Sequence, residues 1–186
     1  MKNLPLKAPT MTLTAGPVAI YPRVQEALSR PVPYDYDPYF LELYEKVCRK
    51  AGLAMRWDAP ALILQVEPAP AIEAAAASLI SAKDTVLNLA SGVYGKGFGY
   101  WALRYCKRLT EVEVPYNQAI NPDQVAKALR ANPDITIVSA VHHDTPSGTL
   151  NPINEIGAVV KEHDALLLVD AVSSFGGMNV HPGDCV

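Results

Sequence analysis

Residues 135–177 read ITIVSAVHHDTPSGTLNPINEIGAVVKEHDALLLVDAVSSFGG, and this stretch decides the fold. It contains two short apolar runs, Ile135–Val141 and Ala165–Val169, separated by apolar residues at helical spacing over 153–163. Strands that are apolar at successive positions are typical of a parallel sheet buried on both faces. The order strand, helix, strand therefore predicts a βαβ unit.

The same alternation extends towards the N-terminus. Further strands are expected over 61–66, 85–89 and 110–114, and helices over 22–30, 38–56, 71–80, 99–109 and 123–131. The predicted fold class is α/β, with a mostly parallel sheet and helices on both faces. Residues 1–20 are expected to form an N-terminal arm, and residues 21–186 to belong to one large domain.

Composition excludes several classes of protein. The 186 residues carry 16 Lys and Arg against 19 Asp and Glu, so the formal charge of −3 gives no basic footprint for nucleic acid or an anionic membrane. No apolar run approaches the ~20 residues of a membrane span, and the N-terminus lacks the apolar core of a secretory signal. The three cysteines form no metal-binding or disulfide pattern. A reduced, cytoplasmic setting is expected.

Ligands of such sheets bind at the carboxyl ends of the strands. Glu67 follows the expected strand 61–66 and lies between Val66 and Pro68, with Pro70 close by. Its carboxylate would repel a phosphate and could accept a hydrogen bond from a hydroxyl group. The alternative is that Glu67 is only a charge at the N-terminus of a helix or a solvated loop residue.

A glycine-rich segment, SGVYGKGFG over 91–99, follows the expected strand 85–89. Its glycines predict a loop that approaches a ligand closely, and Tyr94 could stack on a flat ring. The spacing does not match the dinucleotide pattern G-x-G-x-x-G. The alternative is a flexible turn with a core tyrosine.

Two further segments follow strands. His142 and His143 are adjacent and point to opposite faces of an extended chain, which disfavours a metal site, and Thr145 and Ser147 are better hydrogen-bonding candidates. Asp170 follows the run LLLV, and a carboxylate buried there needs a partner. A protonated pyridine nitrogen, a structural arginine or backbone N–H groups would each serve.

Together these segments resemble the class V group of fold type I aminotransferases. The landmarks are LTAGPV (13–18), AIEAAAASLI (71–80), HHDTPSG (142–148) and VDAVSSFGG (169–177). The resemblance implies that Tyr94 stacks on a pyridine ring, Thr145 lies near the ring 3-oxygen, and Asp170 keeps the ring nitrogen protonated. Ser147 and Ser173 are secondary candidates, and no metal is implied.

A closer resemblance, within that family, is to members that take unphosphorylated pyridoxamine as a substrate. They pass its amino group to pyruvate, giving pyridoxal and L-alanine in vitamin B6 degradation. The matching segments are VEPAP (66–70), LNLASGVYGKGFGYW (87–101), VPYNQAI (114–120), HHDTPSGTLNPI (142–153) and VDAVSSFGGM (169–178). The resemblance implies that Glu67 meets the 5′-hydroxymethyl group and that no prosthetic group is bound. A family member that uses pyridoxal phosphate as cofactor, such as an alanine–glyoxylate aminotransferase, is the alternative.

The family also uses a lysine that forms a Schiff base, arginines that bind the substrate carboxylate, and a small C-terminal domain. The resemblance places all of them beyond Val186, so residues 21–186 are expected to be a partial large domain without turnover of its own. Lys96 is nearest the site in sequence but matches no Schiff-base position. The family implies a homodimer, and a non-catalytic module that only binds the ligand stays open as an alternative.

Overall fold

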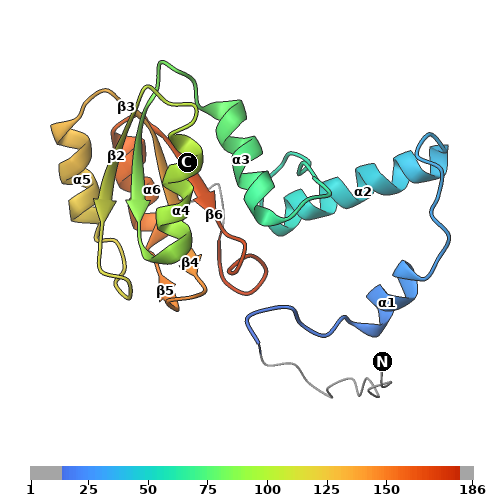
Figure 1. Ribbon diagram of the computed structural model, residues 1–186. Coiled ribbons are helices and arrows are strands. Elements are labelled where there is room, and N and C mark those ends of the chain that lie inside the picture. The colour runs from blue at the N-terminus through green and yellow to red at the C-terminus, as the bar shows by residue number, and fades with distance from the viewer. Residues whose placement is uncertain (1–13, 181–186) are drawn as a thin grey trace, which may run out of the picture. The chain divides into compact units, whose positions relative to one another are not determined.

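The computed structural model of the protein describes residues 14–180 (Figure 1). Contacts along the chain divide it into two compact units, Met1–Tyr44 and Glu45–Val186. The first unit contains α1 (Pro22–Leu28), which has no buried residue, and the start of α2 (Pro38–Ala54). The second unit contains the sheet and every site candidate. The domain boundary expected after residue 20 stays a prediction.

The second unit is built on a sheet of four parallel strands in the order β2-β1-β3-β6. Their bounds are β1 (Thr85–Ala90), β2 (Arg108–Glu113), β3 (Ile135–Val141) and β6 (Leu166–Asp170). A short antiparallel hairpin of β4 (His143–Asp144) and β5 (Thr149–Leu150) follows β3. The parallel sheet predicted from the apolar runs is confirmed.

Helices cover both faces of this sheet (Figure 1). Leu87 and Val138 point to one face and pack with residues of α5 (Pro122–Ala131) and α6 (Ile153–Glu162). Val86 and Ile137, one residue away on the same strands, point to the other face and pack with α3 (Pro68–Leu79) and α4 (Gly92–Ala102). The alternation of side chains along a strand thus produces two apolar cores. No helix within residues 14–180 is long and apolar enough to cross a membrane.

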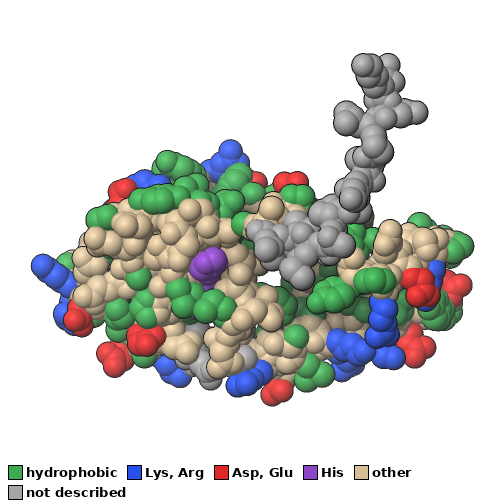
Figure 2. Space-filling model, turned by 90° about the horizontal axis from the view of Figure 1, so that it is seen from below, with side chains coloured by type: hydrophobic (Ala, Val, Ile, Leu, Met, Phe, Trp, Pro, Cys, Tyr) green, Lys and Arg blue, Asp and Glu red, His purple; other side chains and the backbone are tan. Residues whose placement is uncertain are grey.

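The strand expected over 61–66 is absent: these residues have no regular structure and lie outside the sheet. Leu62 is 94% exposed, and Leu64 and Val66 are each 52% exposed. An apolar run becomes a strand only where a neighbouring strand pairs with its backbone, and none of the described strands does so here. Hydrophobic side chains also lie among charged ones on the face drawn in Figure 2.

The glycine-rich segment forms helix α4, so the predicted loop over 91–99 was wrong, as was the helix start at residue 99. Two of its glycines allow the helix to pack closely on β1. A Cβ at Gly99 would lie 2.8 Å from Asn88 Nδ2, and one at Gly95 would lie 3.2 Å from the carbonyl oxygen of Leu89. Small residues therefore let α4 lie directly on β1, which outweighs the low helix propensity of glycine.

This packing predicts opposite effects of two glycine substitutions in the same helix. A Cβ at Gly97 would meet nothing within 4 Å, so Gly97→Ala should raise the free energy of unfolding by about 0.5–1 kcal/mol. Gly99→Ala should lower it by about 1–3 kcal/mol, because the new methyl group displaces the buried Asn88 amide. Urea denaturation of both variants is the measurement. Equal effects of the same sign would contradict the close packing of α4.

Candidate functional site

Three of the predicted site residues, Tyr94, Thr145 and Asp170, lie in segments at the carboxyl ends of the parallel strands. β1 leads through Ser91 into α4, whose first turn holds Tyr94. β3 leads into the hairpin whose turn contains Thr145, and Asp170 is the last residue of β6. The N–H of His142 donates to the carbonyl oxygen of Asp170 at 2.8 Å, which joins the ends of β3 and β6. Since β3 pairs with β1 on one side and with β6 on the other, the three segments leave the same end of the sheet side by side.

Asp170 is half-buried at this end of the sheet. Its Oδ1 accepts a hydrogen bond from the Val172 N–H at 2.9 Å, and within residues 14–180 its other oxygen has no partner. Burial, together with the nearby negative charge of Asp144, raises the pKa of the Asp170 carboxyl group above its ordinary value. A cation beside Asp170 would compensate its charge, so the residue is suited to a protonated ring nitrogen.

The raised pKa gives a stability prediction for the unliganded protein. Asp170 holds its proton to a higher pH in the folded protein than in the unfolded chain. Its contribution to the free energy of unfolding is therefore greatest below pH 3.8 and is lost as the pH rises through the pKa of the folded state. Asp170→Asn has no charge to bury. It should therefore melt at a higher temperature than the unsubstituted protein at pH 8, with a smaller gain at pH 4. Thermal unfolding followed by circular dichroism at the two pH values checks this, and a gain that does not depend on pH would contradict it.

Tyr94 and Thr145 have free hydroxyl groups. Tyr94 is 54% exposed, and Thr145 is half-buried in the turn of the hairpin. Neither hydroxyl makes a hydrogen bond to any residue in the described range 14–180. Both side chains are thus available to a ligand, and their assignment to the ring face and the ring 3-oxygen stays a prediction.

Ser147 and Ser173, by contrast, use their hydroxyl groups within the protein. Ser147 Oγ donates to Asp144 Oδ2 at 2.7 Å. Ser173 Oγ donates to the carbonyl oxygen of His143 at 2.6 Å and lies 2.8 Å from His143 Nδ1. These contacts suit the two serines to holding the site together. His142 contacts a different serine, with its Nδ1 2.9 Å from Ser174 Oγ, so the adjacent histidines point to different partners.

Glu67 is the residue immediately before α3. Its side chain is exposed, and among the described residues no hydrogen bond from its carboxylate caps the helix. Pro68 and Pro70 remove two of the N–H groups that a helix N-terminus normally offers to an anion. Within residues 14–180 the structure joins Glu67 to no other predicted site residue by a hydrogen bond or ion pair.

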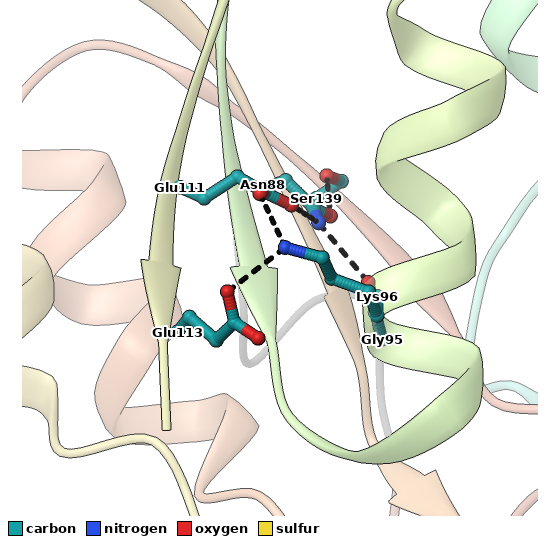
Figure 3. Close-up of polar contacts among 6 residues, drawn as sticks. All are labelled: Asn88, Gly95, Lys96, Glu111, Glu113 and Ser139. Carbon is teal, nitrogen blue, oxygen red and sulfur yellow. Dashed lines mark hydrogen bonds and ion pairs between the residues drawn. The ribbon is translucent and has the colours of Figure 1, made fainter. Parts of the chain in front are cut away.

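Lys96 is held by two carboxylates of β2 (Figure 3). Its Nζ lies 2.7 Å from Glu111 Oε2 and 2.9 Å from Glu113 Oε2. Hydrogen bonds to these groups raise the pKa of Lys96 above its ordinary value. A protonated amine is not a nucleophile, so this lysine is unsuited to attack on a carbonyl group.

The same polar cluster attaches α4 to the middle of the sheet (Figure 3). Asn88 Nδ2 donates to Glu111 Oε1 at 3.0 Å and to the carbonyl oxygen of Gly95 at 3.1 Å, while Ser139 Oγ donates to Asn88 Oδ1 at 2.8 Å. Burial alone would raise the pKa of Glu111, but hydrogen bonds from Lys96 and Asn88 lower it below its ordinary value. The carboxylate is therefore held ionised, and the first half of α4 is fixed over β1.

Asp144 contacts two of the predicted site residues, and the sequence pattern does not single it out. It is fully buried between the hairpin and the start of α4, and it accepts hydrogen bonds from Tyr94 and Ser147. The only sequence signal is local, because Asp, Pro, Ser and Gly close together, as in DTPSG over 144–148, are typical of a turn. The contact with Tyr94 spans 50 positions and has no local signal.

Comparisons with known proteins point to one family. The family model "Aminotransferase class-V" matches residues 69–185. The chain is 64% identical to a pyridoxamine–pyruvate transaminase of Mesorhizobium japonicum over 95% of its length and 45% of the relative's. It matches the crystal structure of pyridoxamine–pyruvate aminotransferase from Mesorhizobium loti with a TM-score of 0.93 and 62% identity, covering 100% of the chain and 47% of that structure. An alanine–glyoxylate aminotransferase from Nostoc sp. matches with a TM-score of 0.88 and 25% identity, over 100% and 49%. The chain thus spans about half the length of the relatives it matches.

Proposed function

Since the chain belongs to the class V aminotransferase family, we propose that it supplies the ring-binding half of an enzyme that transfers the amino group of pyridoxamine to pyruvate. The products are pyridoxal and L-alanine. Pyridoxamine is then a substrate, and no pyridoxal phosphate is bound as a prosthetic group. The proposal includes a cytoplasmic homodimer, in keeping with the free thiols of Cys48 and Cys106.

One observation carries the choice of an unphosphorylated substrate. The N-terminus of α3 presents the exposed carboxylate of Glu67 and two prolines, where a phosphate site would present N–H groups. A phosphate at this turn would be repelled by the negative charge of Glu67 and would find too few N–H donors. A hydroxymethyl group can instead donate a hydrogen bond to the Glu67 carboxylate. The high identity to the Mesorhizobium japonicum transaminase supports the same choice.

Each site residue then has a role in binding or charge. Asp170 accepts a hydrogen bond from the protonated ring nitrogen, and Tyr94 packs on the face of the ring. Thr145 forms a hydrogen bond with the ring 3-oxygen, and Glu67 accepts one from the 5′-hydroxyl group. A protonated pyridine ring withdraws electrons from the carbon that bears the amino group, and this is the chemistry that pyridoxamine itself supplies. Asp170 makes that possible because its charge favours the protonated ring.

Proton transfer at that carbon requires a general base. The family resemblance assigns this role to a lysine beyond Val186, and the ion pairs of Lys96 make it unsuited to replace that lysine. The 186-residue chain alone is therefore expected to show no turnover. Sustained formation of pyridoxal by the chain alone would contradict this assignment.

The test of the function is a transamination assay on the protein at its full encoded length. Pyridoxamine and pyruvate should give pyridoxal and L-alanine in equal amounts, with a higher kcat/KM for pyridoxamine than for pyridoxamine phosphate. A higher kcat/KM for the phosphate ester, or tight binding of pyridoxal phosphate, would overturn the proposal in favour of a phosphate-dependent transaminase. Ligand binding without any turnover would favour a non-catalytic module.

A further inference from the structure

We infer that Asp144 is a positioning residue that fixes the spacing between Tyr94 and Thr145, the two residues proposed to contact the ring, an inference that rests on the proposed function. Its Oδ1 accepts a hydrogen bond from the Tyr94 N–H at 2.8 Å. Its Oδ2 accepts from the Ser147 N–H at 3.1 Å and from Ser147 Oγ at 2.7 Å. One carboxylate therefore binds the first turn of α4 and the turn that follows β4.

Asp144 caps α4 from outside the helix. The residue before the helix, Ser91, would ordinarily accept a hydrogen bond from an N–H of the first turn. Among the described residues Ser91 makes no such cap, and its Oγ donates instead to the carbonyl oxygen of Gln118 at 2.9 Å. The Tyr94 N–H, at the third position of the helix, is satisfied by Asp144. A carboxylate at a helix N-terminus is also favoured by the helix dipole.

The space around the carboxylate leaves little freedom. Asp144 has 0% of its surface exposed, and a Cβ placed on Gly92 would overlap its carboxylate group. Gly92 also has a φ of +71°, which favours glycine. The backbone at the start of α4 is thus seated directly on Asp144. A shift of the hairpin turn that carries Thr145 would move Tyr94 with it.

Asp144 also contributes charge to the site. Burial is the main cause of the raised pKa of Asp170, and the negative charge of Asp144 adds to it, so the two carboxylates lie close enough to interact. Within the described residues Asp144 forms no ion pair, and its charge is stabilised by N–H and O–H donors alone. Both carboxylates would therefore favour a cationic ring over a neutral one.

The test uses Asp144→Asn and a matched control, Asn121→Ala, in the protein at its full encoded length. The Asn side chain keeps the shape but presents an NH₂ group to one set of donors. The control removes an ordinary cap, since Asn121 Oδ1 accepts from the Asp123 N–H at 2.9 Å at the start of α5. Hydrogen exchange of backbone amides and the dissociation constant of pyridoxamine, from its fluorescence, are measured for both variants.

Asp144→Asn should speed exchange about tenfold in residues 92–98 and in residues 145–149 together, and weaken pyridoxamine binding by about tenfold or more. The control should speed exchange only at the start of α5 and leave binding unchanged. If only one of the two segments responds, or if binding survives unchanged while both respond, the inference is wrong.

A second variant covers the case in which Asp144→Asn does not fold. Ser147→Ala removes one donor to the carboxylate and should speed exchange at the Tyr94 amide as well as in its own turn. A response confined to residues 145–149 would overturn the inference. If the unsubstituted protein fails to bind pyridoxamine, the proposed function is wrong, and the exchange data still decide whether Asp144 couples the two segments.

Discussion

Replacing Asp170 by Asn is expected to lower kcat for pyridoxamine–pyruvate transamination by about 10²–10³-fold in the protein at its full encoded length. Asp170 is the half-buried carboxylate at the end of β6, with one oxygen free of partners within residues 14–180. A neutral amide in its place no longer favours the protonated ring, and the ring then withdraws electrons less strongly. Steady-state formation of pyridoxal is the measurement.

Asp134→Asn is the matched control for this variant. Asp134 lies just before β3, at the opposite end of the same sheet, where it pairs with Arg108 at 2.7 Å. The control makes the same chemical change far from the site and should leave kcat unchanged. The melting temperatures of both variants, measured alongside the rates, separate a loss of rate from a loss of folded protein. A kcat within a factor of about two of the unsubstituted protein would remove Asp170 from the site.

Replacing Glu67 by Gly is expected to shrink the preference for pyridoxamine over its phosphate ester by about tenfold or more. The change removes the like charge that opposes the phosphate, and it removes the acceptor for the 5′-hydroxyl group. Both effects act in the same direction, since the first favours the ester and the second disfavours the alcohol. The ratio of the two kcat/KM values measures the change.

Glu73→Gln tests whether the position of the charge matters. Glu73 lies on the same helix and pairs with Arg104 at 2.7 Å. Its replacement changes the net charge of the protein as Glu67→Gly does, and the preference should not move. If both variants shift the preference equally, a general change of potential explains the effect. An unchanged preference in Glu67→Gly would show that another feature selects the substrate.

The sequence predicted those parts of the fold that depend on local pattern. The runs around Leu87, Val138 and Leu168 became parallel strands, because each is apolar and has a neighbour to pair with. The run around Leu64 has the same composition and did not, because strand formation also depends on a partner that composition does not reveal. The glycine content around Gly95 and Gly99 predicts a loop, yet both glycines lie in helix α4 and permit its close packing on β1. Whether a glycine has this role depends on the surface that faces it, which the sequence does not reveal.

In the candidate site, too, local sequence pattern predicts some features, while others depend on residues far along the chain. The sequence predicts Tyr94, Thr145 and Asp170 because they follow strands, and the structure places their segments at the carboxyl ends of these strands. It does not predict Asp144, because the partner of its carboxylate is the Tyr94 N–H, far along the chain. Hydrogen bonds to backbone groups leave no signature in side-chain type. The sequence could thus predict which segments follow the strands, while the contact between Asp144 and the Tyr94 N–H could not be predicted.

The two edges of the sheet differ in a way that affects how the protein behaves in solution. The β2 edge carries Arg108, Glu111 and Glu113, and charged side chains of this kind discourage pairing with another chain. The β6 edge is the run LLLV, partly exposed, and within residues 14–180 no strand lies beyond it. Because the charges on β2 discourage pairing, a further strand would pair more readily at β6. Wherever that edge is left uncovered, its unpaired N–H and C=O groups form a template for aggregation, so coverage of β6 is a condition for handling the protein at high concentration.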